Sequence, residues 1–301
     1  MRQQPVIAVV GPTAAGKSDL AVDIALRLGG ECVNADSMQL YRGMDIGTAK
    51  LTPDEQRGIP HHLLDVWDVT VTASVAEYQK LARAVIDSVE VPVLVGGSGL
   101  YVRAAIDELE FPGTDPEIRA RLEGELAERG PAPLYERLRE QDPAAAAAIL
   151  PSNGRRIVRA LEVIEHTGRP FSATMPSYDA VYPSVQIGLD VPRPELDERI
   201  AVRVGRMWQA GLVEEVRSLL GQGLAEGRTA SRALGYAQVV RFLEGEWSEE
   251  QAIEETVRAT RRFARRQESW FRRDPRVRWL PYDAPDLLEQ SLALISANPF
   301  A

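Results

Sequence analysis

Near the N-terminus, eight consecutive residues have the types and the spacing that bind phosphate. The stretch GPTAAGKS at residues 11–18 matches the pattern G-x-x-x-x-G-K-S/T of a phosphate-binding loop (P-loop). Glycines let backbone N–H groups converge on phosphate oxygens, the lysine adds a positive charge, and the serine hydroxyl can hold Mg²⁺. The stretch therefore predicts a phosphate site, for which a nucleotide is the usual ligand and a pyrophosphate ester is equally compatible. Its members are Gly11, Pro12, Thr13, Ala14, Ala15, Gly16, Lys17 and Ser18.

Two more polar residues are candidates for the same site because each follows a predicted strand. Asp36 comes at the end of ECVNAD, residues 31–36, and Ser98 lies in GGSG, residues 96–99. In open parallel sheets, ligands bind beyond the carboxyl ends of the strands. A carboxylate beside a phosphate site is suited to be a general base or a group that acts with a metal ion. The structural alternatives are an Asx-turn or helix N-cap at Asp36 and a plain turn at Ser98.

The strands and helices that would position these groups follow from the pattern of apolar residues. Apolar runs bounded by turn residues are typical of buried parallel strands, and a helix is expected directly after the P-loop. Strands alternating with helices indicate an α/β fold, here a P-loop NTPase-like core with a parallel sheet and helices on both faces. The runs lie at residues 5–10, 31–36, 89–99 and 183–191, and a last short strand is expected in VRWLPY at 277–282.

A region of different character interrupts the predicted sheet. Between residues 111 and 182, four segments place apolar residues at three- to four-residue spacing, and prolines separate them. We therefore predict an all-helical insertion domain at 111–182. The core domain would consist of residues 1–110 and 183–301. Further helices are expected in the core at 195–210, 212–220, 232–244 and 249–273.

Charge and cysteine content limit the class of protein. The net charge of −9 argues against nucleic acid as a partner, but arginines are concentrated within residues 258–278. Such a concentration favours a polyanionic partner, and a solvated helix face is the alternative. The single cysteine, Cys32, excludes a disulfide framework and fits a reducing cytosol. Because no apolar run approaches the roughly 20 residues of a membrane span, we expect a cytoplasmic protein with no membrane partner.

Blocks of sequence along nearly the whole chain resemble the bacterial tRNA dimethylallyltransferase family, also called the tRNA isopentenyltransferase or IPP transferase family. The most specific block is DSMQLYRGMDIGTAK at residues 36–50, and the least specific is the P-loop. The remaining blocks, in chain order, are GIPHHLLD, VGGSGLY, TDPEIRARL, GRRIVRALEV, RIAVRVGRMWQAGLVEEV, RALGYAQ and RRFARRQESWFRR.

The resemblance implies two substrates and a role for each part of the candidate site. The P-loop would hold the diphosphate of dimethylallyl diphosphate, helped by Arg203 and by Mg²⁺ at Ser18. Asp36 matches the family's general base, which faces the N6 amine of adenosine 37 beside the anticodon. Ser98 stands where the family has a threonine that touches the same amine, and it keeps the hydroxyl. The residues that match tRNA-contacting segments are Asp36, Ser37, Met38, Gln39, Ser98, Arg119, Arg155, Arg156, Arg159, Arg232, Gly235 and Tyr236.

The implied activity is transfer of a dimethylallyl group to N6 of adenosine 37, with release of diphosphate. The family serves tRNAs that read codons starting with U, and we expect a monomer that contacts the anticodon stem-loop. Without the resemblance, the same residues would indicate a P-loop small-molecule kinase or a P-loop ATPase without transfer chemistry. Whether ATP or another nucleotide binds the P-loop stays open at this point. So does the question of whether Arg42, Thr48 and Lys50 line a channel or brace their loop.

Overall fold

A computed structural model describes residues 5–174 and 178–297 of the chain. The ends of the expected core domain, residues 1–4 and 298–301, lie outside the described residues, as do residues 175–177 of the expected insertion. By its internal contacts the chain forms two compact units, one made of residues 1–106 and 180–301 and the other of residues 107–179. We call the first the sheet unit and the second the helical unit.

The sheet unit is built on six parallel strands in the order β3-β2-β4-β1-β5-β6. Every residue of β1, VIAVV, is buried, which explains its continuous apolar run. The expected strands are confirmed, each with somewhat shorter bounds than expected. The largest difference is in the strand expected at 89–99, which spans only 92–96 because residues 97–98 form a turn and a helix begins at Gly99. The strands are β1 (Val6–Val10), β2 (Glu31–Asn34), β3 (His61–His62), β4 (Pro92–Gly96), β5 (Ser184–Asp190) and β6 (Val277–Pro281).

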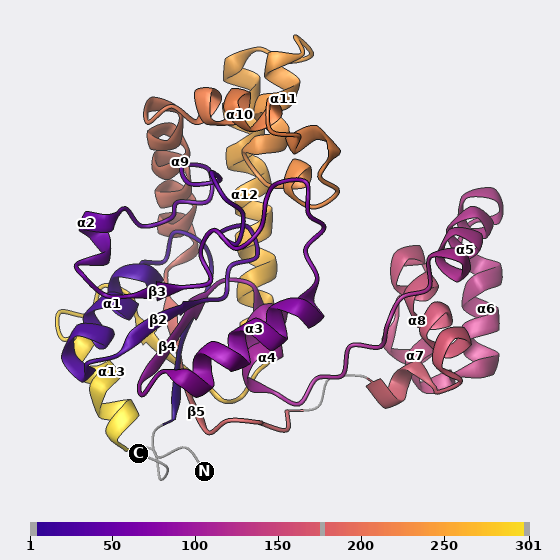
Figure 1. The fold of residues 1–301 in the computed structure, drawn as a ribbon, viewed down its shortest axis with the longest axis horizontal. Helices are drawn as coiled ribbons and strands as arrows, with labels where there is room; N and C mark the ends of the chain where they lie inside the picture. Colours follow the sequence, from indigo (N-terminus) through magenta and orange to yellow (C-terminus); the bar gives the residue numbers. More distant parts are fainter. Residues whose placement is uncertain (1–4, 175–177, 298–301) are drawn as a thin grey trace. The chain divides into compact units, whose positions relative to one another are not determined.

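Helices cover both faces of this sheet, as expected from the alternation of strands and helices. The chain crosses from β1 to β2 in one direction and, after adding β3 at the edge, returns from β3 to β4 in the other. Right-handed crossovers therefore place the two connecting helices on opposite faces. On one face lie α1 (Lys17–Leu28) and α13 (Leu287–Ser296), and on the other α3 (Val75–Ser88) and α4 (Gly99–Ile106) (Figure 1). A single turn, α2 (Pro53–Gln56), lies between β2 and β3.

Four more helices of the sheet unit pack on one another beyond the carboxyl ends of the strands (Figure 1). The helix expected at 232–244 begins later than predicted, because Gly235 has φ 87°, a left-handed conformation in which a helix cannot continue. Of the helices in the described residues, none is long and apolar enough to cross a membrane. The four are α9 (Arg193–Gln209), α10 (Leu212–Leu220), α11 (Tyr236–Leu243) and α12 (Glu249–Phe271).

The helical unit has its own small core of leucine, isoleucine and alanine side chains. Prolines stand in the first turn of three of its helices, where the absent N–H leaves no unmade hydrogen bond. The unit ends at residue 179 and not at 182, because Tyr182 is buried in the sheet unit and its hydroxyl donates to Asp87 Oδ1 at 2.9 Å. Its helices are α5 (Pro116–Arg129), α6 (Pro131–Gln141), α7 (Pro143–Ala148) and α8 (Gly154–Thr167), followed by the 3-10 turn η1 (Phe171–Thr174).

Candidate active site

The P-loop joins β1 to α1 and carries the backbone shape of an anion site. Gly16 is the N-cap residue of α1 with φ 94°, and glycine has no side chain to accept a bond from the first helical amides. Those amides have no acceptor within the helix, so they are available to an anion placed ahead of it. Gly11, Pro12 and Ala15 are buried behind the loop. The P-loop residues that line a cavity are Thr13, Ala14, Gly16, Lys17 and Ser18.

Two cations lie at this cavity without a carboxylate at ion-pair distance among the described residues. Lys17 Nζ donates to the backbone oxygen of Pro12 at 2.7 Å. Burial and the nearby guanidinium of Arg203 lower the pKa of Lys17 to about 8, while Asp36 acts in the opposite direction. Burial also lowers the pKa of Arg203, again against the charge of Asp36. Asp19 also acts on Arg203 in the same direction as Asp36, and an anionic ligand would satisfy both cations more fully.

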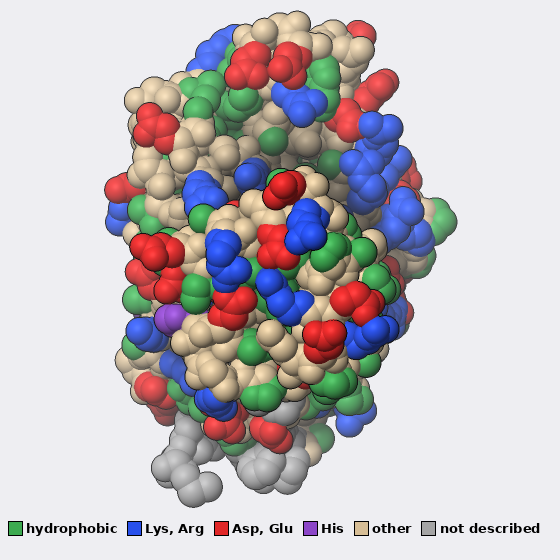
Figure 2. All heavy atoms as spheres, turned by 90° about the vertical axis from the view of Figure 1, so that its right-hand side faces the viewer, with side chains coloured by type: hydrophobic (Ala, Val, Ile, Leu, Met, Phe, Trp, Pro, Cys, Tyr) green, Lys and Arg blue, Asp and Glu red, His purple; other side chains and the backbone are tan. Residues whose placement is uncertain are grey.

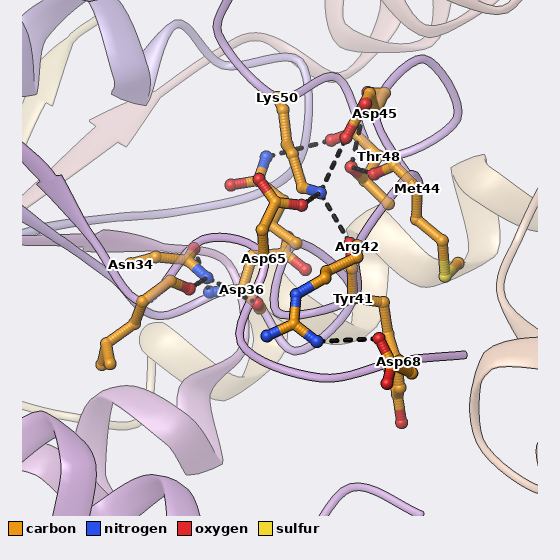
Figure 3. A network of polar contacts seen from close by, with 12 residues as sticks. Asn34, Asp36, Tyr41, Arg42, Met44, Asp45, Thr48, Lys50, Asp65 and Asp68 are labelled. Carbon is orange, nitrogen blue, oxygen red and sulfur yellow. Dashed lines mark hydrogen bonds and ion pairs between the residues drawn. The ribbon is translucent and has the colours of Figure 1, made fainter. Parts of the chain in front are cut away.

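Asp36 has a fixed backbone and one carboxylate oxygen that is already used. The Asn34 side chain accepts from Asp36 N at 2.8 Å and donates to Asp36 O at 3.0 Å (Figure 3). Asp36 Oδ1 accepts from Met38 N at 2.9 Å, so the Asx-turn that was the structural alternative is present. This turn occupies one oxygen only and orients the carboxylate. The structural and the chemical interpretations of Asp36 are therefore compatible.

Asp36 lies where two cavities meet. The first, of about 570 Å³, contains the P-loop wall, and we call it the phosphate cavity. The second, of about 300 Å³, adds apolar side chains such as Met38 and Phe263, and we call it the side cavity. Because the two share several lining residues, a group bound in one lies next to a group bound in the other. The shared residues are Thr13, Asp36, Thr48, Arg203 and Met207.

The turn after β4 brings Ser98 to the same region and reveals a residue that sequence reasoning missed. Ser98 Oγ lies 3.5 Å from Ser37 N, beside the side cavity. Gln267 of α12 accepts from Thr13 N at 2.9 Å and donates to Gly97 O at 2.9 Å, so one buried amide ties the P-loop to this turn. A Cβ at Gly97 would lie 2.2 Å from that amide nitrogen. The sequence carried a signal for it, because Gln267 lies one helical turn from the apolar residues Ala264 and Phe271, both of which are buried, and so belongs to the buried face of the helix.

The polar stretch after Asp36 is mostly a self-bracing loop. Lys50, whose side chain is 6% exposed, donates to Tyr41 O at 2.6 Å and pairs with Asp45 and Asp65 at 2.7 and 2.5 Å (Figure 3). Thr48 Oγ1 donates to Met44 O at 2.5 Å, and Thr48 also lines both cavities. The open question on this stretch is thus answered for two residues, since Lys50 and Thr48 each brace the loop and each line the phosphate cavity.

Arg42, the third uncertain residue of the stretch, lies at the surface. It pairs with Asp68 at 2.7 Å, and both side chains are more than half exposed. An exposed pair of this kind contributes little to stability. Neither cavity includes Arg42 among its lining residues.

Of the remaining residues expected to contact tRNA, those in the sheet unit divide into two groups. Gln39 lines the phosphate cavity, and Ser37, Met38, Arg232 and Gly235 line the side cavity.

Tyr236 does not belong with them, and our expectation of RNA contact there is wrong. Its side chain is fully buried, and its hydroxyl donates to Glu215 Oε1 at 2.5 Å. The aromatic ring therefore has no surface to offer to a partner.

In the helical unit, two of the four candidate arginines neutralise a buried carboxylate. Glu162 is 0% exposed and pairs with both Arg119 and Arg159. Burial would raise the pKa of Glu162, but the hydrogen bonds and charges of these two arginines lower it overall. Arg155 and Arg156 are exposed on the same helix. A polyanion would thus meet Arg155 and Arg156 first, while Arg119 and Arg159 are half-buried parts of the unit's core.

The arginine-rich segment is likewise less free than its sequence indicates. Arg272 pairs with Asp190 and lies 4.0 Å above the Trp279 ring, and Arg261 donates to a backbone oxygen of α9. On the helical unit, which is drawn on the side that faces the viewer in Figure 2, acidic and basic side chains are interspersed. The segment still leaves exposed cations, since Arg258, Arg262 and Arg265 line a shallow groove on α12.

Comparisons with known proteins agree on one family. The family model for IPP transferase matches residues 39–274. A tRNA dimethylallyltransferase of Thermobifida fusca is 72% identical over 299 residues, which are 96% of this chain and 94% of that protein. One of Streptomyces avermitilis is 73% identical over 288 residues, 94% and 92% of the two chains.

Solved structures extend this agreement to the fold. A full-length tRNA isopentenylpyrophosphate transferase from Bacillus halodurans has a TM-score of 0.71 and 39% identity, covering 97% of this chain and 95% of that one. A eukaryotic dimethylallyltransferase shares the fold at a TM-score of 0.81 and 24% identity, covering 98% and 76%. With a P-loop, a carboxylate at the junction of two cavities and relatives over nearly its whole length, this chain belongs to the IPP transferase family.

Proposed function

We propose that this protein transfers the dimethylallyl group of dimethylallyl diphosphate to N6 of adenosine 37 in tRNA. Membership of the IPP transferase family and relatives named tRNA dimethylallyltransferase support the reaction class. The observation that carries the proposal is the position of Asp36 at the junction of the phosphate cavity and the side cavity. A transfer between two bound molecules needs such a junction, with the reacting atoms about 3–3.5 Å apart.

The phosphate cavity is suited to the diphosphate end of the donor. It combines free helix amides at the P-loop with the charges of Lys17 and Arg203. These donors are in place before the reaction, so they stabilise the negative charge that gathers on the diphosphate as it leaves. The lowered pKa values of Lys17 and Arg203 reflect the cost of burying two cations without a full counter-charge, and a bound diphosphate removes that cost.

The side cavity is suited to an unstacked base. At about 300 Å³ it lies at the lower end of ligand-pocket volumes, and Met38 and Phe263 give it apolar walls. An adenosine in the anticodon loop can be flipped out of its stack at a cost of a few kcal/mol. Its N6 amine would then approach Asp36, with Ser98 close by through Ser37.

In the proposed reaction, the N6 nitrogen attacks C1 of the dimethylallyl group. The new N–C bond forms as the C–O bond to diphosphate breaks, and the electron pair of that bond leaves with the diphosphate. Asp36 accepts the proton that N6 loses, through the oxygen not used by the Asx-turn with Met38. An aryl amine is a weak nucleophile, so fixed positions of both partners contribute as much as the base.

Mg²⁺ fits the proposed site as a partner of the diphosphate. In the described residues, no group of three or more His, Cys, Asp or Glu side chains could hold a metal ion by itself. The Ser18 hydroxyl and the Asp36 carboxylate nevertheless line one cavity, and Mg²⁺ commonly takes one or two protein ligands together with phosphate oxygens and water. Ser18 would hold the ion, which when bound neutralises charge on the diphosphate.

The macromolecular partner in this proposal is the anticodon stem-loop of tRNA, bound by one copy of the chain. Exposed arginines at 155, 156, 262 and 265 are available to its phosphates. A cytoplasmic location is part of the proposal, because tRNA is found there and the free, buried Cys32 thiol fits a reducing compartment.

The test is a transfer assay without nucleotide. The protein is incubated with unmodified tRNA, dimethylallyl diphosphate and Mg²⁺, and digested RNA is analysed by mass spectrometry. We expect the mass of one added dimethylallyl group on adenosine 37. The absence of added mass would refute the proposal, and ATP hydrolysis in a parallel incubation with ATP would then favour a P-loop ATPase or kinase.

A further inference from the structure

We propose that Glu215 of α10, with Tyr236 of α11, is a positioning residue that clamps the two walls of the side cavity. The proposal rests on the proposed function, since it concerns the cavity that would take the flipped adenine. Glu215 lines neither cavity itself, so it would act through the loop and the helix that it joins.

The Glu215 carboxylate uses both of its oxygens on one loop and one tyrosine. Oε2 accepts from Asp45 N at 3.1 Å and from Ile46 N at 2.7 Å. Oε1 accepts from Gly47 N at 3.2 Å and from the Tyr236 hydroxyl at 2.5 Å. Three successive backbone amides that converge on one anion form the kind of concave site that phosphates and carboxylates occupy. Here a side chain from 168 or more residues along the chain fills it.

The joined elements are two separate segments of the cavity lining. On the loop side, the side cavity is lined by Gly47, which carries the third clamped amide, and by Thr48 directly after it. On the helix side, Leu234 and Gly235 line it directly before Tyr236. The fit is close, because a Cβ at Gly47 would lie 2.4 Å from the Tyr236 ring. Four hydrogen bonds to one carboxylate therefore set the spacing between these two walls.

A carboxylate is required here, and an amide of the same shape cannot replace it. All four partners are donors, and burial together with the Glu215 charge raises the pKa of Tyr236, so its hydroxyl stays protonated and donates. A glutamine has one acceptor oxygen and turns an NH₂ group toward the remaining donors. At least part of the loop is then released, and Thr48, which also lines the junction with the phosphate cavity, can shift.

The experiment compares three single variants with the wild type in the transfer assay. Glu215→Gln removes acceptors from the loop, and Tyr236→Phe removes one donor without changing the packing. Glu214→Gln is the matched control, because Glu214 is the neighbouring residue of α10, is 70% exposed and, among the residues that the structure describes, pairs only with exposed Arg217. Single-turnover rates are measured at saturating tRNA and dimethylallyl diphosphate, well below each variant's thermal midpoint, and the dissociation constant of dimethylallyl diphosphate is measured separately.

We expect Glu215→Gln to lower the single-turnover rate about 10- to 100-fold, the effect of a displacement near 1 Å at a reacting pair. Tyr236→Phe should lower it by about 3- to 10-fold, as one hydrogen bond to a charged group is lost. Glu214→Gln should stay within about two-fold. In Glu215→Gln the loss of affinity for dimethylallyl diphosphate should be smaller than the loss of rate, because the clamp holds the 45–47 loop and not the P-loop. This split between rate and donor affinity is not expected from a loss of stability alone.

Three results would overturn the clamp. One is a wild-type rate in Glu215→Gln. Another is an equal loss in Glu214→Gln. The third is a wild-type rate in folded Tyr236→Phe, which decides the question if Glu215→Gln does not fold. A wild-type protein that fails to modify tRNA would remove the proposed function, and the clamp with it.

Discussion

Asp36 is the residue on which the proposed chemistry depends, and the structure provides a way to separate its two roles. Its carboxylate holds the local turn through Oδ1, which accepts from Met38 N at 2.9 Å. Its proposed second role is to accept the proton from N6. Asp36→Asn keeps an oxygen for the turn but cannot act as the base, whereas Asp36→Ala removes both functions.

The expected losses follow from these two roles. A lost general base lowers the rate by about 10²- to 10⁴-fold, or roughly 2.7–5.4 kcal/mol in activation free energy. The turn hydrogen bond is worth about 0.5–1.5 kcal/mol, a factor of roughly 2 to 10. Asp36→Asn should therefore show the first loss alone. Asp36→Ala should be slower again by the second factor, because the loop is then less well placed.

The assay is a single turnover with tRNA bound in advance and dimethylallyl diphosphate in excess, followed by binding measurements for each substrate. We expect tRNA affinity to change by less than about three-fold in Asp36→Asn, since the amide preserves the shape of the turn. A rate above one tenth of wild type in Asp36→Asn would show that Asp36 is not the base. A rate loss that follows an equal loss of tRNA affinity would make Asp36 a binding residue instead.

Three other predictions concern charge. In buffer without divalent metal, the affinity for dimethylallyl diphosphate should fall as the pH rises through about 8, because the free protein then loses the Lys17 proton. Titration calorimetry would measure this affinity, and in Lys17→Arg it should depend less on pH, because arginine stays protonated. Charge reversal of exposed Arg155 and Arg156 should weaken tRNA binding and reduce its dependence on salt, and an unchanged salt dependence would contradict this. Arg159→Glu should chiefly lower the thermal midpoint, because it leaves the fully buried Glu162 with one cation fewer. Burial raises the pKa of the Cys32 thiol to about 12, so alkylation at pH 8 should be slow in the native protein and fast in urea, and equal rates would contradict the burial.

Much of the fold could be predicted because its determinants are local. The P-loop carries its glycines, lysine and helix start within eight residues, and the buried strands appear as unbroken apolar runs. The strand β3 could not be found this way, since it is two histidines long and has no apolar run. The late start of α11 was missed because propensity alone does not reveal the left-handed backbone at Gly235.

Some residues of the candidate site could likewise be predicted from the sequence, and others could not. Asp36 and Ser98 could be proposed because each follows a strand, and strand ends meet at one edge of a parallel sheet. The sequence by itself thus determined the P-loop, the polar residues that follow the predicted strands, and the family resemblance. It could not tell that Arg119 and Arg159 neutralise Glu162, or that Tyr236 is buried.

Only the tertiary structure decided which polar groups meet. Gln267 reaches Thr13 across 254 residues, and Glu215 reaches the 45–47 amides across about 170. Such pairings depend on how α10 and α12 pack beyond the sheet, and a helical pattern shows which face of a helix is buried but not what that face meets. The physical reason is that a buried polar group must be satisfied, while any donor or acceptor of suitable shape can satisfy it.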